Sequence, residues 1–468
     1  MLITSVILAA GEGTRMKSAV PKVLHPILGK PMLSYTIDSA LQATEMEPIV
    51  VIGHGADAVN DRFGKQVKFA YQGECLGTGH AVQQAEDLLR GKADIVLVTY
   101  GDMPLIQSGT LKQLIQTKVE HPGPMVMLTI TADDPKGFGR IVRDADGMVE
   151  EIVEEAQATD EKLAIKELNP GVYCFQATWL WDALRRINLS PKGEYYLTDL
   201  VGIAVKEGKQ VKAVKMEDPN EFIGINTRVH LAEATAILQQ RINLKWMNAG
   251  VTILDPERTY IEPAVEIGMD TVIWPGSYLQ GNTIIGKSCS IGPNSIIRNS
   301  KIADRCEVFS SVLEGATLED DVNIGPYGHL RAGAHLAQGV HMGNFGEVKN
   351  SFLGPGTKMG HFSYLGDTIT GENVNIGAGA ITCNYDGENK NKTEIGSDVF
   401  IGSDTMLIAP IRLADGARTG AGSVVTKDVP EDSLAVGMPA RVIRRNKKRN
   451  NKKGNYSTRH SERNEESP

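Results

Sequence analysis

A glycine-rich turn near the start of the chain could bind phosphate. Gly11 and Gly13 follow a short apolar run, and Arg15 and Lys22 come soon after them. Glycines let the backbone turn tightly and approach a ligand, and backbone N–H groups can cradle phosphate oxygens together with cationic side chains. The segment lacks the Gly-Lys-Ser/Thr of a P-loop, so two interpretations remain open on these residues alone: a phosphate site and an ordinary tight turn.

A carboxylate follows another apolar run. Asp102 comes just after Ile95–Val98, in the segment Tyr100-Gly101-Asp102. Ligands of α/β sheets bind at the carboxyl ends of the strands, and a carboxylate placed there can hold Mg²⁺. Taken alone, Asp102 is equally typical of a strand-end cap or a turn.

The second half of the chain holds residues suited to acid–base chemistry. His361 carries an imidazole, which can remove a proton near neutral pH. Arg331 and Lys349 could bind a phosphate, arginine through its planar fork. Each of these side chains could also be an ordinary solvated surface residue.

The elements that must position the first group alternate along residues 1 to about 226. Short β-rich apolar runs alternate with helical patterns, which predicts a mostly parallel sheet covered by helices. The predicted strands include Ser5–Ala9, Ile49–Ile52, Ile95–Val98 and Met125–Thr131, and the predicted helices include Met32–Ala43 and Thr110–Glu120.

Residues 227–249 contain neither proline nor glycine, and apolar residues recur there at steps of three and four. This spacing predicts one long amphipathic linker helix. Its apolar positions are Leu231, Ala234, Leu238, Ile242 and Trp246.

From about residue 251 the apolar period changes to six. A six-residue period fits neither a helix nor a hairpin, and it predicts a parallel β-helix of hexapeptide repeats whose periodic residues point inward. The series comprises Ile267, Ile273, Leu279, Ile285, Ile291 and Ile297, then Ile324, Leu330, Leu336, Met342 and Val348, then Ile395, Ile401, Leu407, Leu413, Thr419 and Val425. Residues 382–393 are polar and are predicted to leave the coil as a loop, a common location for function. His361 lies between Met359 and Leu365, so its side chain should face outward.

Composition excludes several classes of protein. The chain has 468 residues, 41% of them hydrophobic, and no apolar run approaches the ~18 residues that span a membrane. The apolar start lacks the basic region of a signal peptide, and the five scattered cysteines form no Cys-x-x-Cys pair, so we expect a cytoplasmic protein with reduced thiols. Residues 441–468 contain ten Lys and Arg against three Glu, a charge of +7, so the remainder of a chain of net charge −8 carries −15. This acidic body argues against a nucleic-acid partner, and the basic tail is predicted to be disordered.

The N-terminal motifs resemble those of the sugar-phosphate nucleotidylyltransferases. The string Leu8-Ala9-Ala10-Gly11-Glu12-Gly13-Thr14-Arg15-Met16, followed by Pro21-Lys22, is the most specific part of the resemblance. The resemblance implies that this loop grips UTP, that Arg15 and Lys22 neutralise charge in catalysis, and that Asp102 and Asn226 hold Mg²⁺. The other substrate-binding positions that it implies are Leu8, Ala9, Ala10 and Gly11 in the loop, Gln72, Gly77 and Thr78 around uracil, Tyr100 and Gly101, and Gly139, Glu154 and Asn169 around the sugar. A lysine common after Glu154 in that family is missing here.

The C-terminal motifs are similar to those of hexapeptide acyltransferases that use acetyl-coenzyme A. Over about residues 3–440 the chain resembles the family of bifunctional bacterial N-acetylglucosamine-1-phosphate uridylyltransferases/glucosamine-1-phosphate N-acetyltransferases. The resemblance implies His361 as the general base, sugar phosphate held by Arg331, Lys349, Tyr364 and Asn375, and acetyl-coenzyme A held by Ala378, Asn384, Tyr385, Ser403 and Ala421. The chain departs from the family pattern at Ala332, Asn350 and Met438, and Arg441 or Arg444 is a candidate to replace an arginine absent at 438.

The resemblance implies an α/β nucleotidyltransferase (Rossmann-like) domain and a left-handed parallel β-helix. We expect a uridylyltransferase domain at 1–226, a linker helix at 227–250, an acetyltransferase domain at 251–440 and a tail at 441–468. Glucosamine 1-phosphate would be acetylated from acetyl-CoA, and N-acetylglucosamine 1-phosphate would then react with UTP to give UDP-N-acetylglucosamine, a precursor of peptidoglycan and lipopolysaccharide. The family also implies a homotrimer. Two alternatives remain: an enzyme for another sugar or nucleotide, similar to the glucose-1-phosphate adenylyltransferases, and a non-catalytic protein whose β-helix is an assembly rod.

Overall fold

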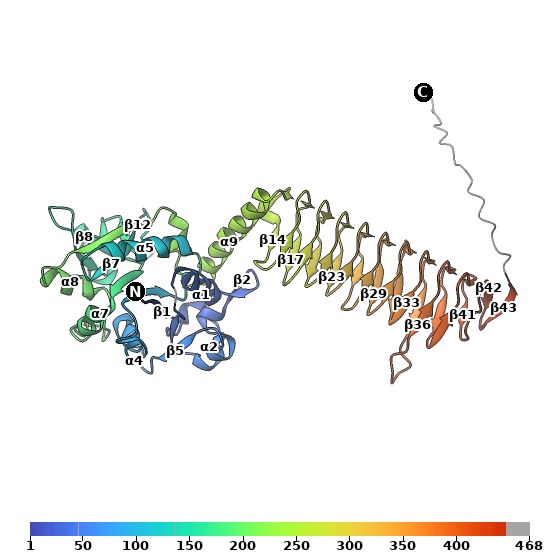
Figure 1. Ribbon diagram of the computed structural model, residues 1–468, viewed down its shortest axis with the longest axis horizontal. Coiled ribbons are helices and arrows are strands. Elements are labelled where there is room, and N and C mark those ends of the chain that lie inside the picture. Colours follow the sequence, from blue (N-terminus) through green and yellow to red (C-terminus); the bar gives the residue numbers. More distant parts are fainter. Residues whose placement is uncertain (45, 136, 446–468) are drawn as a thin grey trace, which may run out of the picture. The chain divides into compact units, whose positions relative to one another are not determined.

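The computed structural model describes residues 1–44, 46–135 and 137–445. The chain divides into two compact units, one of residues 1–244 and one that begins at Lys245. Figure 1 shows a mixed helix-and-sheet unit and a stack of short strands. The functional boundaries at 226, 250 and 440 remain predictions.

The first unit is built on a ten-stranded sheet in the order β5-β4-β1-β6-β11-β7-β10-β8-β9, with β12 paired to β7. Four neighbouring strands are parallel, as predicted: β1 (Ile3–Leu8), β4 (Ile49–Ile52), β5 (Lys68–Tyr71) and β6 (Ile95–Tyr100). All four residues of β4 are buried, which is why this strand reads as a continuous apolar run.

The other half of the sheet is not mostly parallel, and that part of the prediction is wrong. Its strands are β7 (Met125–Thr131), β8 (Gly139–Arg143), β9 (Val149–Val153), β10 (Glu167–Asn169), β11 (Tyr173–Gln176) and β12 (Val211–Lys215). Strand β11 runs antiparallel to both β6 and β7, and β8 and β9 form an antiparallel pair, whereas β12 is parallel to β7. A single buried strand inserted in reverse leaves no mark on the apolar pattern, because its residues are buried in either direction.

Helices cover this sheet. They are α1 (Met32–Ala43), α2 (Ala56–Phe63), α3 (Thr78–Gln83), α4 (Glu86–Leu89), α5 (Ser108–Glu120), α6 (Asp160–Leu163), α7 (Ala177–Leu184) and α8 (Asp199–Lys206). A small hairpin joins β2 (Pro26–Ile27) to β3 (Lys30–Pro31). The predicted helix Met32–Ala43 is confirmed, and the one predicted at Thr110–Glu120 begins two residues earlier.

Helix α9 spans Arg228–Asn248, where one long helix was predicted. Ala234 and Leu238 are buried, but the helix also buries Gln239 and Asn243. The expected apolar stripe is therefore only part of the buried face, and the helix is less amphipathic than its spacing suggested. The Arg241 guanidinium donates to the Leu105 carbonyl at 2.7 Å.

The second unit is a left-handed parallel β-helix with three faces, each a sheet of short strands that are parallel except for the last strand of face one. Face one contains β13 (Thr252–Ile253), β16 (Val272–Ile273), β19 (Ser290–Ile291), β22 (Glu307–Val308), β25 (Asn323–Ile324), β28 (His341–Met342), β31 (Lys358–Met359), β34 (Asn375–Ile376), β37 (Phe400–Ile401), β40 (Arg418–Thr419), β42 (Ser433–Gly437) and β43 (Ala440–Arg445). Face two contains β14 (Tyr260–Ile261), β17 (Tyr278–Gln280), β20 (Ile296–Arg298), β23 (Val312–Glu314), β26 (His329–Leu330), β29 (Gly346–Lys349), β32 (Ser363–Gly366), β35 (Ile381–Cys383), β38 (Met406–Ile408) and β41 (Val424–Val425). Face three contains β15 (Glu266–Ile267), β18 (Ile284–Ile285), β21 (Lys301–Ile302), β24 (Thr317–Leu318), β27 (His335–Leu336), β30 (Phe352–Leu353), β33 (Thr368–Thr370), β36 (Thr393–Ile395) and β39 (Ile411–Leu413).

The inward ladder is confirmed. Every periodic position predicted to point inward is buried, including Thr419, the one polar member of the series. The register stacks each rung on the next, as Ile273 on Ile291 shows. A continuous interior of this kind gives each coil most of its stability through its neighbours.

Two features interrupt the coil. Between β35 and β36 a polar segment leaves the stack, as predicted, and Figure 1 shows it projecting beside β36. At the C-terminal end, β43 pairs antiparallel with β42 over residues 440–445. The tail predicted to be disordered from 441 is thus wrong for residues 441–445, and residues 446–468 lie outside the described residues. In the described part of the chain, no helix is long and apolar enough to cross a membrane.

Candidate active sites

The carboxyl ends of the parallel strands build a first cavity of about 300 Å³. The residues after β1 form one wall: Gly101 donates its N–H to the Leu8 carbonyl at 2.9 Å, which ties the end of β6 to the end of β1. The predicted residues that line this cavity are Leu8, Ala9, Ala10, Gly11, Lys22, Gln72, Gly77, Thr78, Tyr100 and Asp102. Gly13 has φ 66°, and a Cβ there would lie 2.6 Å from Lys22 Cβ, so the loop needs this glycine to pass beside Lys22.

A second cavity of about 420 Å³ continues from the first. Both cavities are lined by Thr78, Tyr100, Asp102 and Tyr196. The predicted residues that line only the second cavity are Arg15, Gly139, Glu154, Asn169 and Asn226. The structure therefore brings together every predicted residue of the first site except Gly101, which is buried and not part of the cavity walls.

Lys22 connects the predicted metal ligands. Its ammonium forms an ion pair with Asp102 and donates to the Asn226 side-chain oxygen at 3.2 Å. The Ile225 N–H donates to the Asp102 carbonyl at 2.9 Å and so anchors the segment that carries Asn226 beside the end of β6. Two oxygen donors that converge on one cationic group also suit a hard divalent cation, which takes few protein ligands and keeps several other oxygens.

The wall of the second cavity that contains Glu154, Asn169 and Thr198 is polar and mostly buried. Thr198 donates to Glu154 at 3.0 Å, and Asn169 donates to the Tyr173 hydroxyl at 2.7 Å. Burial raises the pKa of Glu154 above its usual value, and burial also raises the pKa of Tyr100, with smaller contributions from Glu154 and Asp102. These groups can form strong hydrogen bonds to a bound hydroxyl because the site is shielded from water.

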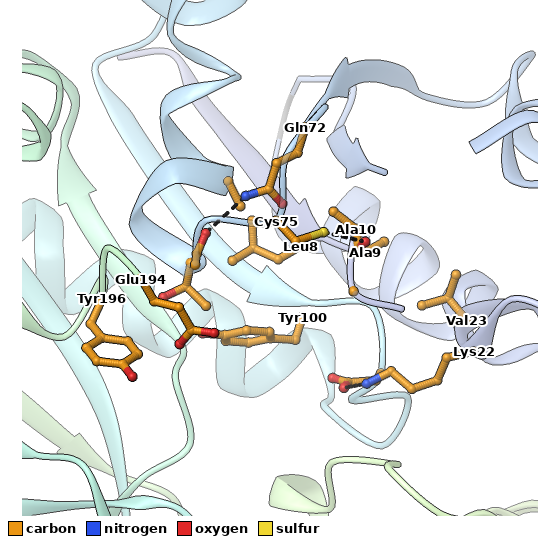
Figure 2. A pocket seen from close by; sticks show the side chains of 15 residues that line it. Leu8, Ala9, Ala10, Lys22, Val23, Gln72, Cys75, Tyr100, Glu194 and Tyr196 are labelled. Atoms are coloured by element: carbon orange, nitrogen blue, oxygen red, sulfur yellow. Dashed lines mark hydrogen bonds and ion pairs between the residues drawn. The ribbon is translucent and has the colours of Figure 1, made fainter. Parts of the chain in front are cut away.

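Sequence reasoning missed several residues of the first site. Cys75, Glu194 and Tyr196 line the first cavity, and Figure 2 labels all three. His230 lines the second cavity and its Nδ1 lies 3.4 Å from the Asn226 backbone N. Cys75 and Glu194 come from connections with no apolar periodicity, whereas His230 lies at a polar position in the first turn of α9, which the apolar spacing does not mark.

The second group of predicted residues lies on the outer surface of the β-helix. Val348 pairs with Leu330 on one side and Leu365 on the other, so Arg331 and Lys349 follow stacked rungs of face two. Arg331 pairs with Glu347 at 3.0 Å. Lys390, from the projecting loop, lies beside Lys349 and lowers the pKa of that ammonium. Three cations therefore gather where an anion would bind.

The projecting loop begins inside this group. Asn384 is 6% exposed and donates to Asp367 at 2.6 Å, and Asn350 donates to the other oxygen of Asp367 at 2.6 Å. These hydrogen bonds lower the pKa of Asp367 despite its partial burial. The Tyr364 hydroxyl and the Asn384 amide both lie over Gly366, which places them side by side. Tyr385 is 60% exposed on the loop.

A second row of predicted residues follows the edge between faces one and two. His361 is exposed, as predicted, in the turn between β31 and β32. Ala378, Ser403 and Ala421 occupy the equivalent turns of the next three coils, where Asp404 N donates to the Ala378 carbonyl and Gly422 N to the Ser403 carbonyl. Asn375 lies apart on face one, so a single chain does not bring it onto the face that carries Tyr364.

An α/β unit with a glycine-rich loop over a polar strand-edge cavity, followed by a hexapeptide β-helix, defines a class of two-domain transferases. The profile of the nucleotidyl transferase family matches residues 4–251. The profile of bacterial transferase hexapeptide repeats matches residues 264–299, and that of the hexapeptide repeat of succinyl-transferase matches residues 392–427.

Curated relatives extend the match to almost the whole chain. A protein of Exiguobacterium sp. named Bifunctional protein GlmU is 47% identical over 445 residues, which covers 95% of this chain and 98% of that relative. Proteins of the same name from Heliobacterium modesticaldum and Geobacillus sp. are 45% and 46% identical and cover 95% and 94% of this chain and 97% and 96% of their own lengths. The chain therefore belongs to the GlmU family of bifunctional proteins.

Proposed function

We propose that each of the two sites described above catalyses one step of a two-step synthesis of UDP-N-acetylglucosamine. The chain is a bifunctional enzyme with acetyltransferase and uridylyltransferase activity. The amine of glucosamine 1-phosphate is acetylated from acetyl-CoA at the β-helix. N-acetylglucosamine 1-phosphate then reacts with UTP in the first unit. The observation that carries this proposal is the convergence of Lys22, Asp102 and Asn226 between two connected cavities at the strand edge.

The uridylyl step is a substitution at phosphorus. An oxygen of the sugar phosphate attacks the α-phosphorus of UTP, that bond forms, and the bond to pyrophosphate breaks. The attacking phosphate is already anionic, so no general base is required. Arg15 and Lys22 would neutralise the charge on the phosphates, and most of the catalysis would be positioning.

Asp102 and Asn226 are the residues that would hold Mg²⁺. The Lys22 ammonium lies against both of their oxygens, so the pair already accommodates one cationic group. When bound, the ion would supply further charge neutralisation at the phosphates. Lys22 would then turn from the carboxylate toward a phosphate oxygen.

The acetyl step needs a free amine. His361 would take a proton from the sugar amine, which attacks the thioester carbonyl, and the coenzyme A thiol leaves. Arg331, Lys349 and Lys390 would hold the phosphate, and Asn384 would orient the acetyl group or stabilise the oxyanion. Tyr364 would contact the sugar. The turns at Ala378, Ser403 and Ala421 would line acetyl-CoA along the edge that continues from His361.

We also propose a homotrimer that works in the cytoplasm. Asn375 and Tyr364 lie on different faces of one β-helix, and a neighbouring subunit would supply the missing face to each acetyltransferase site. All five cysteines carry free thiols, which suits a reducing compartment.

Two alternatives remain testable: an enzyme for another sugar or nucleotide, and an assembly rod without catalysis. The test is pyrophosphate release with N-acetylglucosamine 1-phosphate, using UTP or ATP, with and without EDTA. The proposal predicts release with UTP that EDTA abolishes. An adenylyltransferase would prefer ATP, and an assembly rod would release no pyrophosphate with either nucleotide.

A further inference from the structure

His80 contacts Gln72, a residue that the family resemblance places around uracil. Gln72 follows β5, is 5% exposed and lines the first cavity, whereas His80 lies on α3 and is not part of the cavity wall. The Gln72 amide nitrogen lies 3.1 Å from the Gly77 carbonyl and 3.1 Å from His80 Nδ1. Figure 2 shows the first of these contacts as a dashed line from Gln72. Any effect of His80 on a bound base must therefore pass through Gln72.

The Gly77 carbonyl determines which end of the Gln72 amide is which. A carbonyl oxygen can only accept a hydrogen bond, so the atom that faces it must be the NH₂ group. The same NH₂ group faces His80 Nδ1, which must then accept, so the ring carries its proton on Nε2. Both amide hydrogens are used. The Gln72 Oε1 atom makes no hydrogen bond with any residue in the described ranges and remains an acceptor for a ligand.

Gly77 supplies the complementary donor. Its N–H makes no hydrogen bond within the part of the chain that the structure describes. Its φ is 98°, and a Cβ there would lie 2.7 Å from the Tyr195 carbonyl oxygen, so this backbone is fixed and needs glycine. An acceptor beside a donor matches uracil, which presents N3–H next to a carbonyl oxygen. Cytosine presents an unprotonated N3 next to an amine, which mismatches both groups.

We propose that His80 is a positioning residue: its Nδ1 holds the Gln72 amide with the oxygen toward the cavity and so sets the preference for uracil over cytosine. This inference rests on the proposed uridylyltransferase function. Without an acceptor at Nδ1, one amide hydrogen loses its partner, and the Gly77 carbonyl alone then keeps the amide oxygen toward the cavity. The cost of this unpaired buried donor reduces the advantage of that orientation, so the preference for uracil over cytosine becomes weaker.

Two isosteric substitutions separate the acceptor from the ring. In His80→Asn the Oδ1 atom can take the position of Nδ1 and accept the same hydrogen bond. In His80→Leu a methyl group takes that position and cannot accept. His121→Leu serves as a control, because His121 contacts the Gln210 carbonyl and lines neither cavity.

The measurement is competition between UTP and CTP in one reaction of the full chain with N-acetylglucosamine 1-phosphate. The ratio of UDP-sugar to CDP-sugar gives the ratio of the two kcat/KM values. We expect His80→Leu to lower this ratio about 5- to 10-fold and to raise KM for UTP while kcat changes less than about twofold, the size expected for one hydrogen bond. His80→Asn and His121→Leu should stay within about twofold of the unmodified protein.

An equal fall in the Leu and Asn variants would overturn the inference, because the ring would then act by packing. An unchanged ratio in His80→Leu, together with a lowered ratio in Gln72→Leu, would also overturn it while leaving the base-reading role of Gln72 intact. If Gln72→Leu itself left the ratio unchanged, Gln72 would not read the base and the inference would fall with that role. If the unmodified chain released no pyrophosphate from UTP, the proposed function and this inference would both be wrong.

Discussion

Lys22 donates a hydrogen bond to Asp102, a residue 80 positions further along the chain. The two side chains are only 14% and 17% exposed, so this ion pair is shielded from solvent. It joins the loop after β1 to the end of β6. The contact is the structural basis for assigning phosphate binding and cation binding to a single site.

Asp102→Asn keeps the side-chain shape and removes the charge. We expect uridylyl transfer to fall by about 100-fold or more, because charge neutralisation at the phosphates is the main catalytic contribution in phosphoryl-type transfer. Acetyl transfer by the same preparation should not change. The measurement is pyrophosphate release over a range of Mg²⁺ concentrations.

Asp146→Asn, in an exposed turn between β8 and β9, is the matched control and should keep full activity. If Asp102→Asn kept the wild-type rate of uridylyl transfer at every Mg²⁺ concentration, Asp102 would not be a metal ligand.

His361→Ala should affect only the other reaction. Loss of a general base lowers the rate of proton-coupled acyl transfer by about 10²- to 10⁴-fold. Uridylyl transfer should remain nearly intact, because His361 lies in the second unit. Release of free coenzyme A and release of pyrophosphate can be measured on one sample. His341→Ala removes an exposed histidine of β28 that contacts Asn323, and it should leave both rates unchanged. Equal loss of both activities in His361→Ala would instead indicate misfolding.

Adjacent isoleucines of β18 test the register of the β-helix. Ile285 points inward and is 2% exposed, whereas Ile284 points outward and is 42% exposed. Ile285→Ala should lower the free energy of unfolding by about 2–5 kcal/mol, because it leaves a cavity in the stacked core. Ile284→Ala should change that free energy by about 0.5 kcal/mol or less. Chemical denaturation of both variants measures the difference, and similar effects at the two positions would contradict the register.

Two glutamates of the first unit should change stability with pH in opposite directions. Burial raises the pKa of Glu154, so the folded state holds this proton more tightly than the unfolded chain does. The stability associated with Glu154 is greatest below the unfolded pKa and is lost as pH rises through the higher folded value. Glu154→Gln should therefore raise Tm at neutral pH relative to the unmodified protein, with the gain disappearing in acid.

Glu167 provides the contrasting case. Hydrogen bonds from Arg143, at 2.8 and 2.7 Å, lower its pKa in the folded state. Its contribution is present above the unfolded pKa and is lost as pH falls through the lower folded value. Glu167→Gln should lower Tm at neutral pH, and the loss should fade in acid. Thermal unfolding at several pH values measures both effects, and shifts of the same sign for the two variants would contradict the assigned pKa directions.

Much of the fold could be predicted because it follows from burial patterns. The apolar runs of β4 and β7 are bounded by charge, glycine or proline. A β-helix is the regular structure that buries an apolar residue at every sixth position. Strand direction could not be predicted in the same way. The reversed strand β11 is buried on both faces, so its pattern equals that of a parallel strand.

The sites were predicted where they contain motifs and missed where they depend on contacts distant in sequence. Gln72 belongs to a motif, whereas Glu194 lines the same cavity from a connection more than a hundred residues later. Lys390 joins Arg331 and Lys349 only because a polar loop folds back toward face two. Helix α9 is a further case, since its buried face includes Gln239 and Asn243, which no apolar spacing identifies.

Product analysis with single omissions tests the two-step function most directly. The complete mixture contains the purified chain, glucosamine 1-phosphate, acetyl-CoA, UTP and Mg²⁺, and each omission removes one small-molecule component. The account predicts UDP-N-acetylglucosamine only in the complete mixture, with N-acetylglucosamine 1-phosphate accumulating when UTP is left out. If UDP-N-acetylglucosamine formed only after N-acetylglucosamine 1-phosphate was supplied, the β-helix would not be an acetyltransferase for this sugar. Ala332, Asn350 and Met438, where the chain departs from the family pattern, would then be the first positions to replace by the residues common in the family.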